Sequence, residues 1–196
     1  MLATLGKVCT TYKVKELDEH EALELFNQHV LCGNKLDEDC FELANQVIKY
    51  AKGLPLALTI IGSDLRGRKT SNWKSAVHRY RKIPKGDIHK ILKVSYDGLE
   101  EVEKDIFLDI ACFFNGWNKK HVVDILDPFN SWPTYVISSL VYKCLITIGP
   151  VGNLWMHDIV QKMGREIVRQ ESPILTKRSR LWAYEDAHEV FMRSKV

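Results

Sequence analysis

The triplet Met156-His157-Asp158 lies where a predicted strand meets a predicted helix. Asp158 is of a residue type that caps helix N-termini, and Gln161 follows at the capping-box position. His157 would then stand beside exposed backbone N–H groups and the positive end of the helix dipole, where an anion such as phosphate is favoured. The alternative is that Asp158 only caps the helix and His157 only links two elements.

A second segment with potential chemistry is Gly53-Leu54-Pro55-Leu56-Ala57. The glycine can end one helix and the proline can start the next, where its missing N–H has no cost, while the flanking leucines pack. In one interpretation, the segment only ends one helix and begins the next. The other is that the proline ring presents a flat apolar face to a planar ligand such as a nucleotide base.

Sequence motifs of autonomous enzymes do not occur in residues 1–196: there is no H-E-x-x-H, no G-x-S-x-G and no GxxxxGK[ST]. The seven histidines are scattered, and no Cys and His residues stand at metal-ligand spacing. We therefore predict neither catalytic residues nor a metal site, and we do not expect an enzyme.

Charge and cysteine content restrict the class further. The 28 basic and 25 acidic residues give a formal charge of +3 and are spread along the chain, so no strong polyanion-binding field is expected. The five cysteines form no C-x-x-C pair, which is typical of reduced intracellular thiols. Because no run of about 18 apolar residues occurs, we expect a cytoplasmic or nuclear protein without a membrane segment.

The apolar pattern predicts a mainly α-helical fold, in which a helical bundle is followed by a winged helix with a small β-hairpin. A strand over 12–17 leads into the first helix, with Asp18 as its cap and Glu21 three residues on. Helices are expected at 19–32, 37–52, 55–65, 71–80 (with Ser71 as cap), 88–96, 101–114, 118–126, 134–144, from 158 to before Pro173, and at 184–193. Strands are expected at 145–148 and 153–156, around a Gly-Pro-Val-Gly turn.

Four segments are proposed from this order. They are residues 1–17, the last strand of a preceding unit; 18–84, the helical bundle; 85–172, the winged helix; and 173–196, a C-terminal linker. Because the first element reads as the end of something else, we expect a fragment of a longer protein. The alternative is a truncated gene product.

Several segments together resemble one family, the plant disease-resistance receptors that carry a Toll/interleukin-receptor-like domain in front and leucine-rich repeats behind. They are YKVKELDEHEALELF (12–26), GLPLALTIIGSDLRGR (53–68), ILKVSYDGL (91–99), FLDIACFF (107–114), MHD (156–158), GREIVRQESP (164–173) and KRSRLW (177–182). Their order covers nearly the whole chain, and the FLDIACFF form indicates the Toll-like subclass.

This resemblance implies an ADP/ATP-dependent switch in which a P-loop subdomain, a helical bundle and a winged helix close over ADP and swing apart with ATP. Pro55 would lie against the adenine with Leu54 beside it, and His157 would hydrogen-bond the β-phosphate. Four residues would support these contacts: Gly53, Leu56, Met156 and Asp158. Residues 1–17 would be the last strand of a nucleotide-binding subdomain whose P-loop and Mg²⁺ site precede residue 1, and residues 173–196 would lead toward the leucine-rich repeats. The chain alone should therefore bind ADP weakly or not at all.

The resemblance also implies the partners: the Toll-like domain, the P-loop subdomain and the repeats of the same receptor, with a homo-oligomer on activation. Two alternatives remain. A winged helix can bind DNA, but the predicted helix 134–144 carries one basic residue, Lys143, which argues against groove contacts. The other alternative is an interaction scaffold that functions without nucleotide. The basic run 66–69 is assigned no function, because a run of charges is usually a solvated face.

Overall fold

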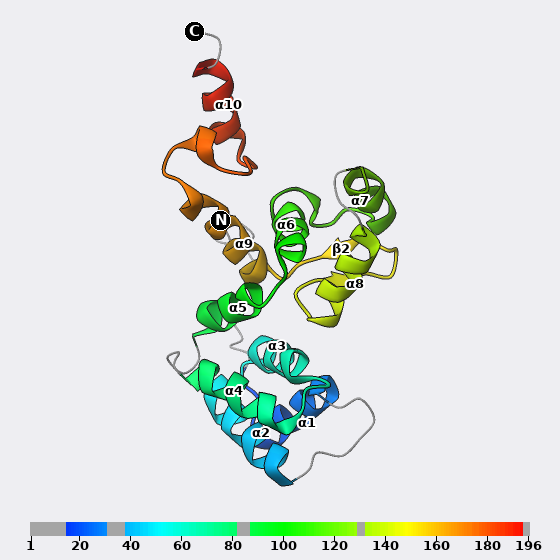
Figure 1. Ribbon diagram of the computed structural model, residues 1–196, viewed down its shortest axis with the longest axis vertical. Coiled ribbons are helices and arrows are strands. Elements are labelled where there is room, and N and C mark those ends of the chain that lie inside the picture. The colour runs from blue at the N-terminus through cyan, green and yellow to red at the C-terminus, as the bar shows by residue number, and fades with distance from the viewer. Residues whose placement is uncertain (1–14, 31–37, 82–86, 129–131, 194–196) are drawn as a thin grey trace, which may run out of the picture.

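The computed structural model describes residues 15–30, 38–81, 87–128 and 132–193. Four helices form the bundle drawn in blue and cyan in Figure 1: α1 (Glu19–Val30), α2 (Glu38–Ala51), α3 (Pro55–Leu65) and α4 (Thr70–Arg81). Helix α1 packs on α3, and α2 packs on α4. All four helices were predicted: α1 and α2 from apolar periodicity, α3 from Pro55 in its first turn, and α4 from an expected cap at Ser71.

The first helix cap is the predicted capping box. The Asp18 carboxylate accepts from the Glu21 backbone N–H at 2.9 Å, and the Glu21 carboxylate accepts from the Asp18 N–H at 3.0 Å. The predicted cap of α4 is wrong. That helix already begins at Thr70, before Ser71, because the carbonyl of Lys69 accepts the first backbone bonds.

Close helix packing holds the bundle core together. Phe26 of α1 and Trp73 of α4 are buried and meet edge to face, with ring centroids 6.2 Å apart. On α3, a Cβ added to Gly62 would lie 3.0 Å from the Cβ of His29. The glycine therefore permits the close approach of α3 to α1.

The second half is a winged helix. Its elements are α5 (Ile88–Asp97), α6 (Glu101–Asp109), the π-helical η1 (Ile110–Phe114), α7 (Lys119–Leu126), α8 (Pro133–Tyr142), β1 (Thr147–Ile148), β2 (Leu154–Trp155) and α9 (Asp158–Glu171). The strands pair antiparallel, with Thr147 opposite Trp155. Gly152 takes φ +82° in the turn between them, a value that favours glycine. Three helices followed by a hairpin confirm the predicted fold class.

The winged helix has its own core, built from α6, η1, α8 and α9 around the buried Ile106, Phe107 and Ile137. Gly164 of α9 sits directly on this core. A Cβ there would lie 2.7 Å from the Cβ of Ala111 and 3.1 Å from the Phe107 ring. Helix α9 is therefore fixed against the end of α6 and the π-helical turn.

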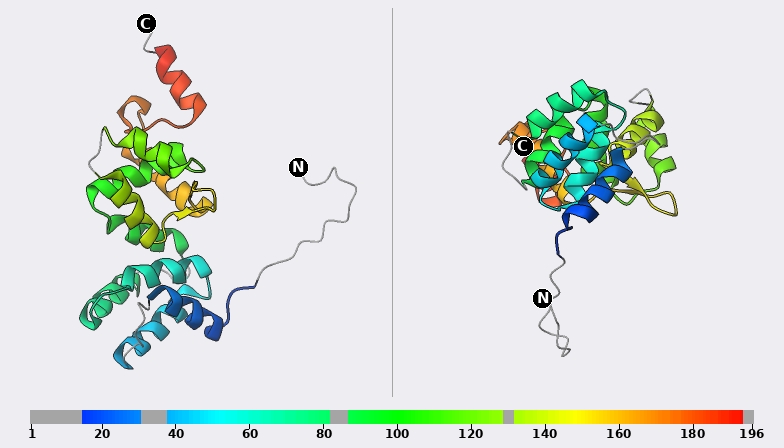
Figure 2. Two further views of the ribbon diagram at one scale, coloured as in Figure 1. Left: turned by 90° about the vertical axis from the view of Figure 1, so that its right-hand side faces the viewer. Right: turned by 90° about the horizontal axis from the view of Figure 1, so that it is seen from below.

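The two cores meet across α3 and α5. Ile60 of α3 belongs to the winged-helix core, and Ile91 of α5 belongs to the bundle core, and each is almost fully buried. Figure 2 shows the bundle and the winged helix stacked along the long axis of the molecule. Each unit thus contributes one isoleucine to the core of the other. Helix α5, which carries Ile91, is therefore the structural joint between the two units.

The two ends of the described chain differ from expectation in one respect. Of the strand predicted at 12–17, residues 12–14 lie outside the described residues, and residues 15–17 are irregular. The Leu17 N–H there donates to the Gly53 carbonyl at 3.0 Å and not to a strand. At the other end, η2 (Leu175–Lys177) precedes α10 (Tyr184–Arg193), which was predicted with these bounds and extends away from the winged helix in Figure 1.

Candidate functional site

The N-terminus of α9 is capped by His157 and not by Asp158. The Nδ1 atom of His157 accepts a hydrogen bond from the Ile159 backbone N–H at 3.2 Å, and Asp158 is the first helical residue. The predicted capping box with Gln161 is also wrong, because the Gln161 side chain donates to the Ala111 carbonyl at 3.0 Å instead. Asp158 remains in the first turn, where a carboxylate interacts favourably with the helix dipole.

This cap determines the tautomer of the His157 imidazole. Because Nδ1 accepts a hydrogen bond, the proton of the neutral ring is assigned to Nε2. The His157 side chain is exposed, so Nε2 can offer this hydrogen to a group outside the chain. His157 is therefore prepared as a hydrogen-bond donor at a helix N-terminus, which is the arrangement an anionic oxygen requires.

The residue before the histidine anchors it. Met156 is 4% exposed, and its N–H donates to the Asn115 side-chain oxygen at 2.9 Å. Two turns into α9, Arg165 joins Gln161 in donating to the Ala111 carbonyl, with Arg165 Nε 3.1 Å from that oxygen. The start of α9 is thus tied to the π-helical end of the FLDIACFF segment, a helix type that often marks functional sites.

The Gly53–Leu56 segment forms the second predicted half of the site. Gly53 takes φ +66°, and a Cβ there would lie 2.3 Å from the Leu17 carbonyl oxygen, so only glycine fits. Pro55 is the first residue of α3, as predicted, and its ring is exposed. Leu54 packs on the bundle core, whereas Leu56 packs on the winged-helix core. Pro55 therefore lies on the surface between two leucines that belong to different cores.

The two halves of the predicted site lie on helices that both pack against α5, namely α3 and α9. Neither Pro55 nor His157 lines the two cavities described below, of about 830 and 80 Å³. Among the described hydrogen bonds, none joins Asp158 to His157. A shared nucleotide contact of Pro55 and His157 therefore stays a prediction.

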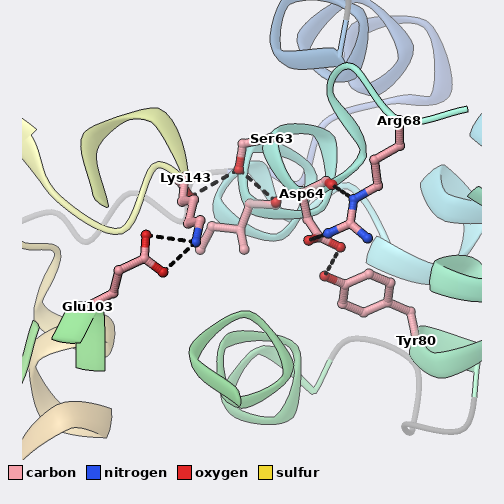
Figure 3. A network of polar contacts seen from close by, with 7 residues as sticks. Ser63, Asp64, Arg68, Tyr80, Glu103 and Lys143 are labelled. Atoms are coloured by element: carbon pink, nitrogen blue, oxygen red, sulfur yellow. Dashed lines mark hydrogen bonds and ion pairs between the residues drawn. The ribbon is translucent and has the colours of Figure 1, made fainter. Parts of the chain in front are cut away.

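A polar network at the joint between the two units was not predicted (Figure 3). Ser63 of α3 donates to the Lys143 carbonyl at 3.0 Å, and the Lys143 ammonium lies 2.7 Å from Glu103 Oε2. Ser139 donates to the other oxygen of Glu103 at 2.5 Å. Burial would raise the pKa of Glu103, but the hydrogen bonds from Lys143 and Ser139 outweigh it, so this pKa lies below its ordinary value. The smaller cavity, of about 80 Å³, lies beside this network.

A second set of contacts crosses the same joint. The Arg66 guanidinium lies 4.8 Å from the centre of the Tyr142 ring, and its Nε donates to the His29 carbonyl. The His29 ring in turn lies 3.7 Å from the Cys144 sulfur. Arg66, which had received no role from its basic run, thus connects the bundle to the end of α8.

Residues 178–180 of the basic segment are docked against the winged helix and α10. Arg180 Nε lies 2.6 Å from the Asp109 carboxylate, and the Arg180 side chain is 11% exposed. Arg178 donates to the Ser172 carbonyl at 2.9 Å and pairs with Asp186 of α10. Asp105 and Asp109 on α6 were candidate partners for Arg180. They lie more than 70 residues before it, so the sequence did not indicate this pairing.

The larger cavity, of about 830 Å³, is lined by residues of α5 and α9 and by Trp182. Its lining is rich in basic residues. They are His89, Lys90, Lys93, Lys162, Arg165 and Arg169, with Glu166 as the acidic exception. The groove could not be predicted from the sequence, because its two walls lie about 70 residues apart in the chain and neither segment is unusually basic by itself.

The exposed face of α8 does not resemble a DNA-reading helix. Within this described helix, its exposed side chains are Thr134, Tyr135, Ser138 and Tyr142, and none is basic. Tyr135 is 72% exposed, whereas Val136 and Ile137 are buried. Lys143 is held by Glu103.

Among the described residues, Cys40, Cys112 and Cys144 form no disulfide, and Cys9 and Cys32 lie outside the described residues. Within the described ranges, no cluster of three His, Cys, Asp or Glu side chains could hold a metal ion. A search of the same ranges finds no helix with the length and apolar character needed to cross a membrane.

Residues 100–172 match the winged-helix domain of Roq1-like disease resistance proteins. The chain is 43% identical over 87% of its length to the Disease resistance protein RPV1 of Vitis rotundifolia, and 40% identical over 91% of its length to the TMV resistance protein N of Nicotiana glutinosa. It is 39% identical over 87% of its length to the Disease resistance protein RRS1 of Arabidopsis thaliana. The chain spans only 12%, 16% and 12% of these relatives, respectively.

Proposed function

Because the chain belongs to the plant disease-resistance proteins that share a Roq1-like winged-helix domain, we propose that it forms part of an ADP/ATP-dependent switch in an immune receptor. In this proposal the bundle and the winged helix each contribute one contact to a bound ADP. A P-loop subdomain elsewhere in the receptor holds the triphosphate chain and Mg²⁺ and provides most of the binding free energy. The chain acts in signalling and not as a catalyst.

The observation that carries this proposal is the cap made by His157. Its Nδ1 is occupied by the Ile159 N–H, and its exposed ring therefore directs the Nε2–H away from the chain. A β-phosphate oxygen would accept that hydrogen while it lies near the positive end of α9. A charge-assisted hydrogen bond of this kind contributes about 1.5–3 kcal/mol.

Pro55 supplies the complementary contact in this proposal. Its ring is exposed at the first position of α3, where the missing N–H leaves no donor unsatisfied. Leu54 extends the apolar surface that an adenine ring would cover. Gly53 supports this turn, since its φ of +66° and its contact with the Leu17 carbonyl exclude a side chain.

A switch requires that ADP distinguish two arrangements of the receptor. A ligand shifts a conformational equilibrium only by its differential affinity for the two states. Pro55 and His157 belong to different packing units, so a nucleotide that contacts both binds better when these units and the P-loop subdomain are closed together. Loss of the His157 contact should therefore favour the open, signalling state.

Photoaffinity labelling tests this proposal directly. A receptor polypeptide that includes the P-loop subdomain and this chain is loaded with 2-azido-ADP, irradiated and digested for mass spectrometry. Label on the peptide that contains Leu54 and Pro55 is the expected result, and excess ADP should suppress it. Label confined to peptides outside residues 1–196 would overturn the adenine contact.

The DNA-binding alternative gains no support from the exposed, uncharged face of α8. A scaffold that functions without nucleotide is the remaining alternative. It predicts that substitutions at His157 leave ADP retention unchanged, whereas the proposed switch predicts faster release of ADP.

A further inference from the structure

The basic groove between α5 and α9 has two walls and an apolar floor. Along α9, Lys162, Arg165 and Arg169 recur at helical spacing on the side of the groove, over roughly 10 Å of helix. Lys90 and Lys93 stand on the opposite wall. The floor is formed by Met163, Ile167 and Trp182. Such a groove fits an elongated occupant that has acidic groups beside apolar ones.

The occupant is better described as a peptide helix than as a phosphate chain. Glu166 also lines the groove, and its carboxylate would repel a run of phosphates. The Arg169 guanidinium already lies 5.3 Å from the centre of the Trp182 ring, so a stacked base would have to displace it. An amphipathic helix can instead place apolar side chains on the floor and carboxylates beside the lysines.

One segment of the chain itself has this chemistry. Helix α10 has no buried residue, and its side chains Tyr184, Phe191 and Met192 are 77%, 71% and 56% exposed. At helical spacing these three share one face, together with Ala187 and His188. Glu185 and Glu189 follow at the edge of that face. The helix thus presents an apolar stripe with an acidic flank.

The helix is held pointing away from its own groove. The ion pair between Arg178 and Asp186 fixes its first turn to the η2 segment, and both side chains are largely buried. In Figure 1, α10 continues outward along the long axis of the molecule. A return into its own groove would break this pair, whereas the groove of another molecule can be reached with the pair intact.

We propose that α10 of one copy docks in the α5–α9 groove of a second copy. Each molecule then donates one helix and accepts one, which gives a closed two-fold dimer. Phe191 and Tyr184 cover the Met163–Trp182 floor. Glu185 and Glu189 lie against Lys162 and Arg169. Nucleotide has no part in this contact, so it is independent of the proposed switch.

A charge-exchange experiment on the full 196-residue chain tests the dimer by sedimentation velocity over a range of concentrations. One variant, K162E/R169E, makes the groove acidic, and another, E185K/E189K, makes the helix basic. Each alone should associate at least about tenfold more weakly than the wild type, since like charges then meet. Mixed together, the two variants should associate again, because both helix–groove contacts in the mixed dimer join opposite charges.

The control is K119E/K120E, which changes the net charge equally but lies on α7, outside the groove. Its association should match that of the wild type, and higher salt should weaken the wild-type dimer. A wild-type chain that stays monomeric at every concentration overturns the proposal. So does a mixture of the two variants that associates no better than either alone, since that outcome assigns the groove to another occupant or to α10 of the same molecule.

Discussion

Lys143 joins the two packing units by two different atoms: its ammonium lies 2.7 Å from the buried Glu103 carboxylate, and its carbonyl accepts a hydrogen bond from Ser63 of the bundle. Glu103 lies on α6, Lys143 follows α8, and Ser63 lies on α3. Three helices therefore depend on one lysine. The joint that a conformational switch would need to open or preserve is held by identifiable polar contacts.

Replacement of Lys143 by Met should lower the free energy of unfolding by about 2 kcal/mol, because Glu103 would keep a buried charge without its cation. Urea denaturation measures the loss. The double variant K143M/E103Q should recover part of it, since no buried charge remains. If K143M unfolds at the same urea concentration as the surface variant K120M, the ion pair contributes nothing to stability.

The same carboxylate predicts a pH dependence. The pKa of Glu103 is raised by burial but is lowered more by its hydrogen bonds, so in the folded chain it lies below the ordinary 4.5. The unfolded state therefore binds the proton more readily, and the stabilisation is fully present above pH 4.5 and is lost as pH falls through the folded pKa. In the Glu103→Gln variant, the free energy of unfolding should fall less steeply with decreasing pH in this acid range. Thermal unfolding from pH 6 downward measures this dependence. An unchanged slope would contradict the assignment.

Two glycines with similar backbone angles provide a matched pair. Gly53 has φ +66° and would place a Cβ 2.3 Å from the Leu17 carbonyl, whereas Gly67 has φ +69° and no atom within 4 Å of such a Cβ. Gly67→Ala should lower the free energy of unfolding by about 1 kcal/mol, from backbone strain alone. Gly53→Ala should lower it by more, about 2–4 kcal/mol. Equal losses in chemical denaturation would show that the Leu17 contact adjusts without cost.

Arg180 should control how firmly the segment after α9 is attached. Arg180→Ala removes the contacts to Asp109 and to the Asp105 carbonyl, and it should expose Leu181 and Trp182 to chymotrypsin several-fold faster than in the wild type. Arg193→Ala is the control, because its pair with Glu189 is exposed and lies within α10. Equal digestion of both variants would indicate that other contacts hold the segment.

Much of the fold could be predicted from local pattern. The Asp18–Glu21 capping box, Pro55 at the start of α3 and the Gly149–Gly152 turn depend on neighbours within a few residues, and each occurs as predicted. The predicted cap of α9 was wrong by one residue. The Nδ1 atom of a histidine can accept a backbone hydrogen bond as an aspartate carboxylate can, so the sequence did not show whether the helix begins at Asp158 or one residue later.

The features that sequence could not provide depend on contacts between distant segments. Glu103 and Lys143 lie 40 residues apart, and Arg180 and Asp109 lie 71 apart, so neither ion pair is visible in a local pattern. The α5–α9 groove has the same origin, because its walls come from separate helices. Pro55 and His157 were identified through motifs, and their exposure agrees with a contact outside the chain, but their joint use by one nucleotide stays a prediction.

The most direct test of that claim separates the two functions of His157. His157→Asn keeps a side-chain oxygen that can accept the Ile159 N–H, and so preserves the cap, but it removes the outward Nε2–H. His157→Ala removes both and should also lower stability by about 1 kcal/mol. Asp158→Val removes a carboxylate from the first turn and should likewise weaken the ADP state.

The decisive measurement is the rate at which a fluorescent ADP analogue leaves a receptor polypeptide that contains the P-loop subdomain, chased with unlabelled ADP. The account predicts release at least about tenfold faster from His157→Asn than from the wild type, the equivalent of one charge-assisted hydrogen bond, with unfolding unchanged. Release from His157→Asn at the wild-type rate would contradict it, because the exposed imidazole would then have no contact with the nucleotide.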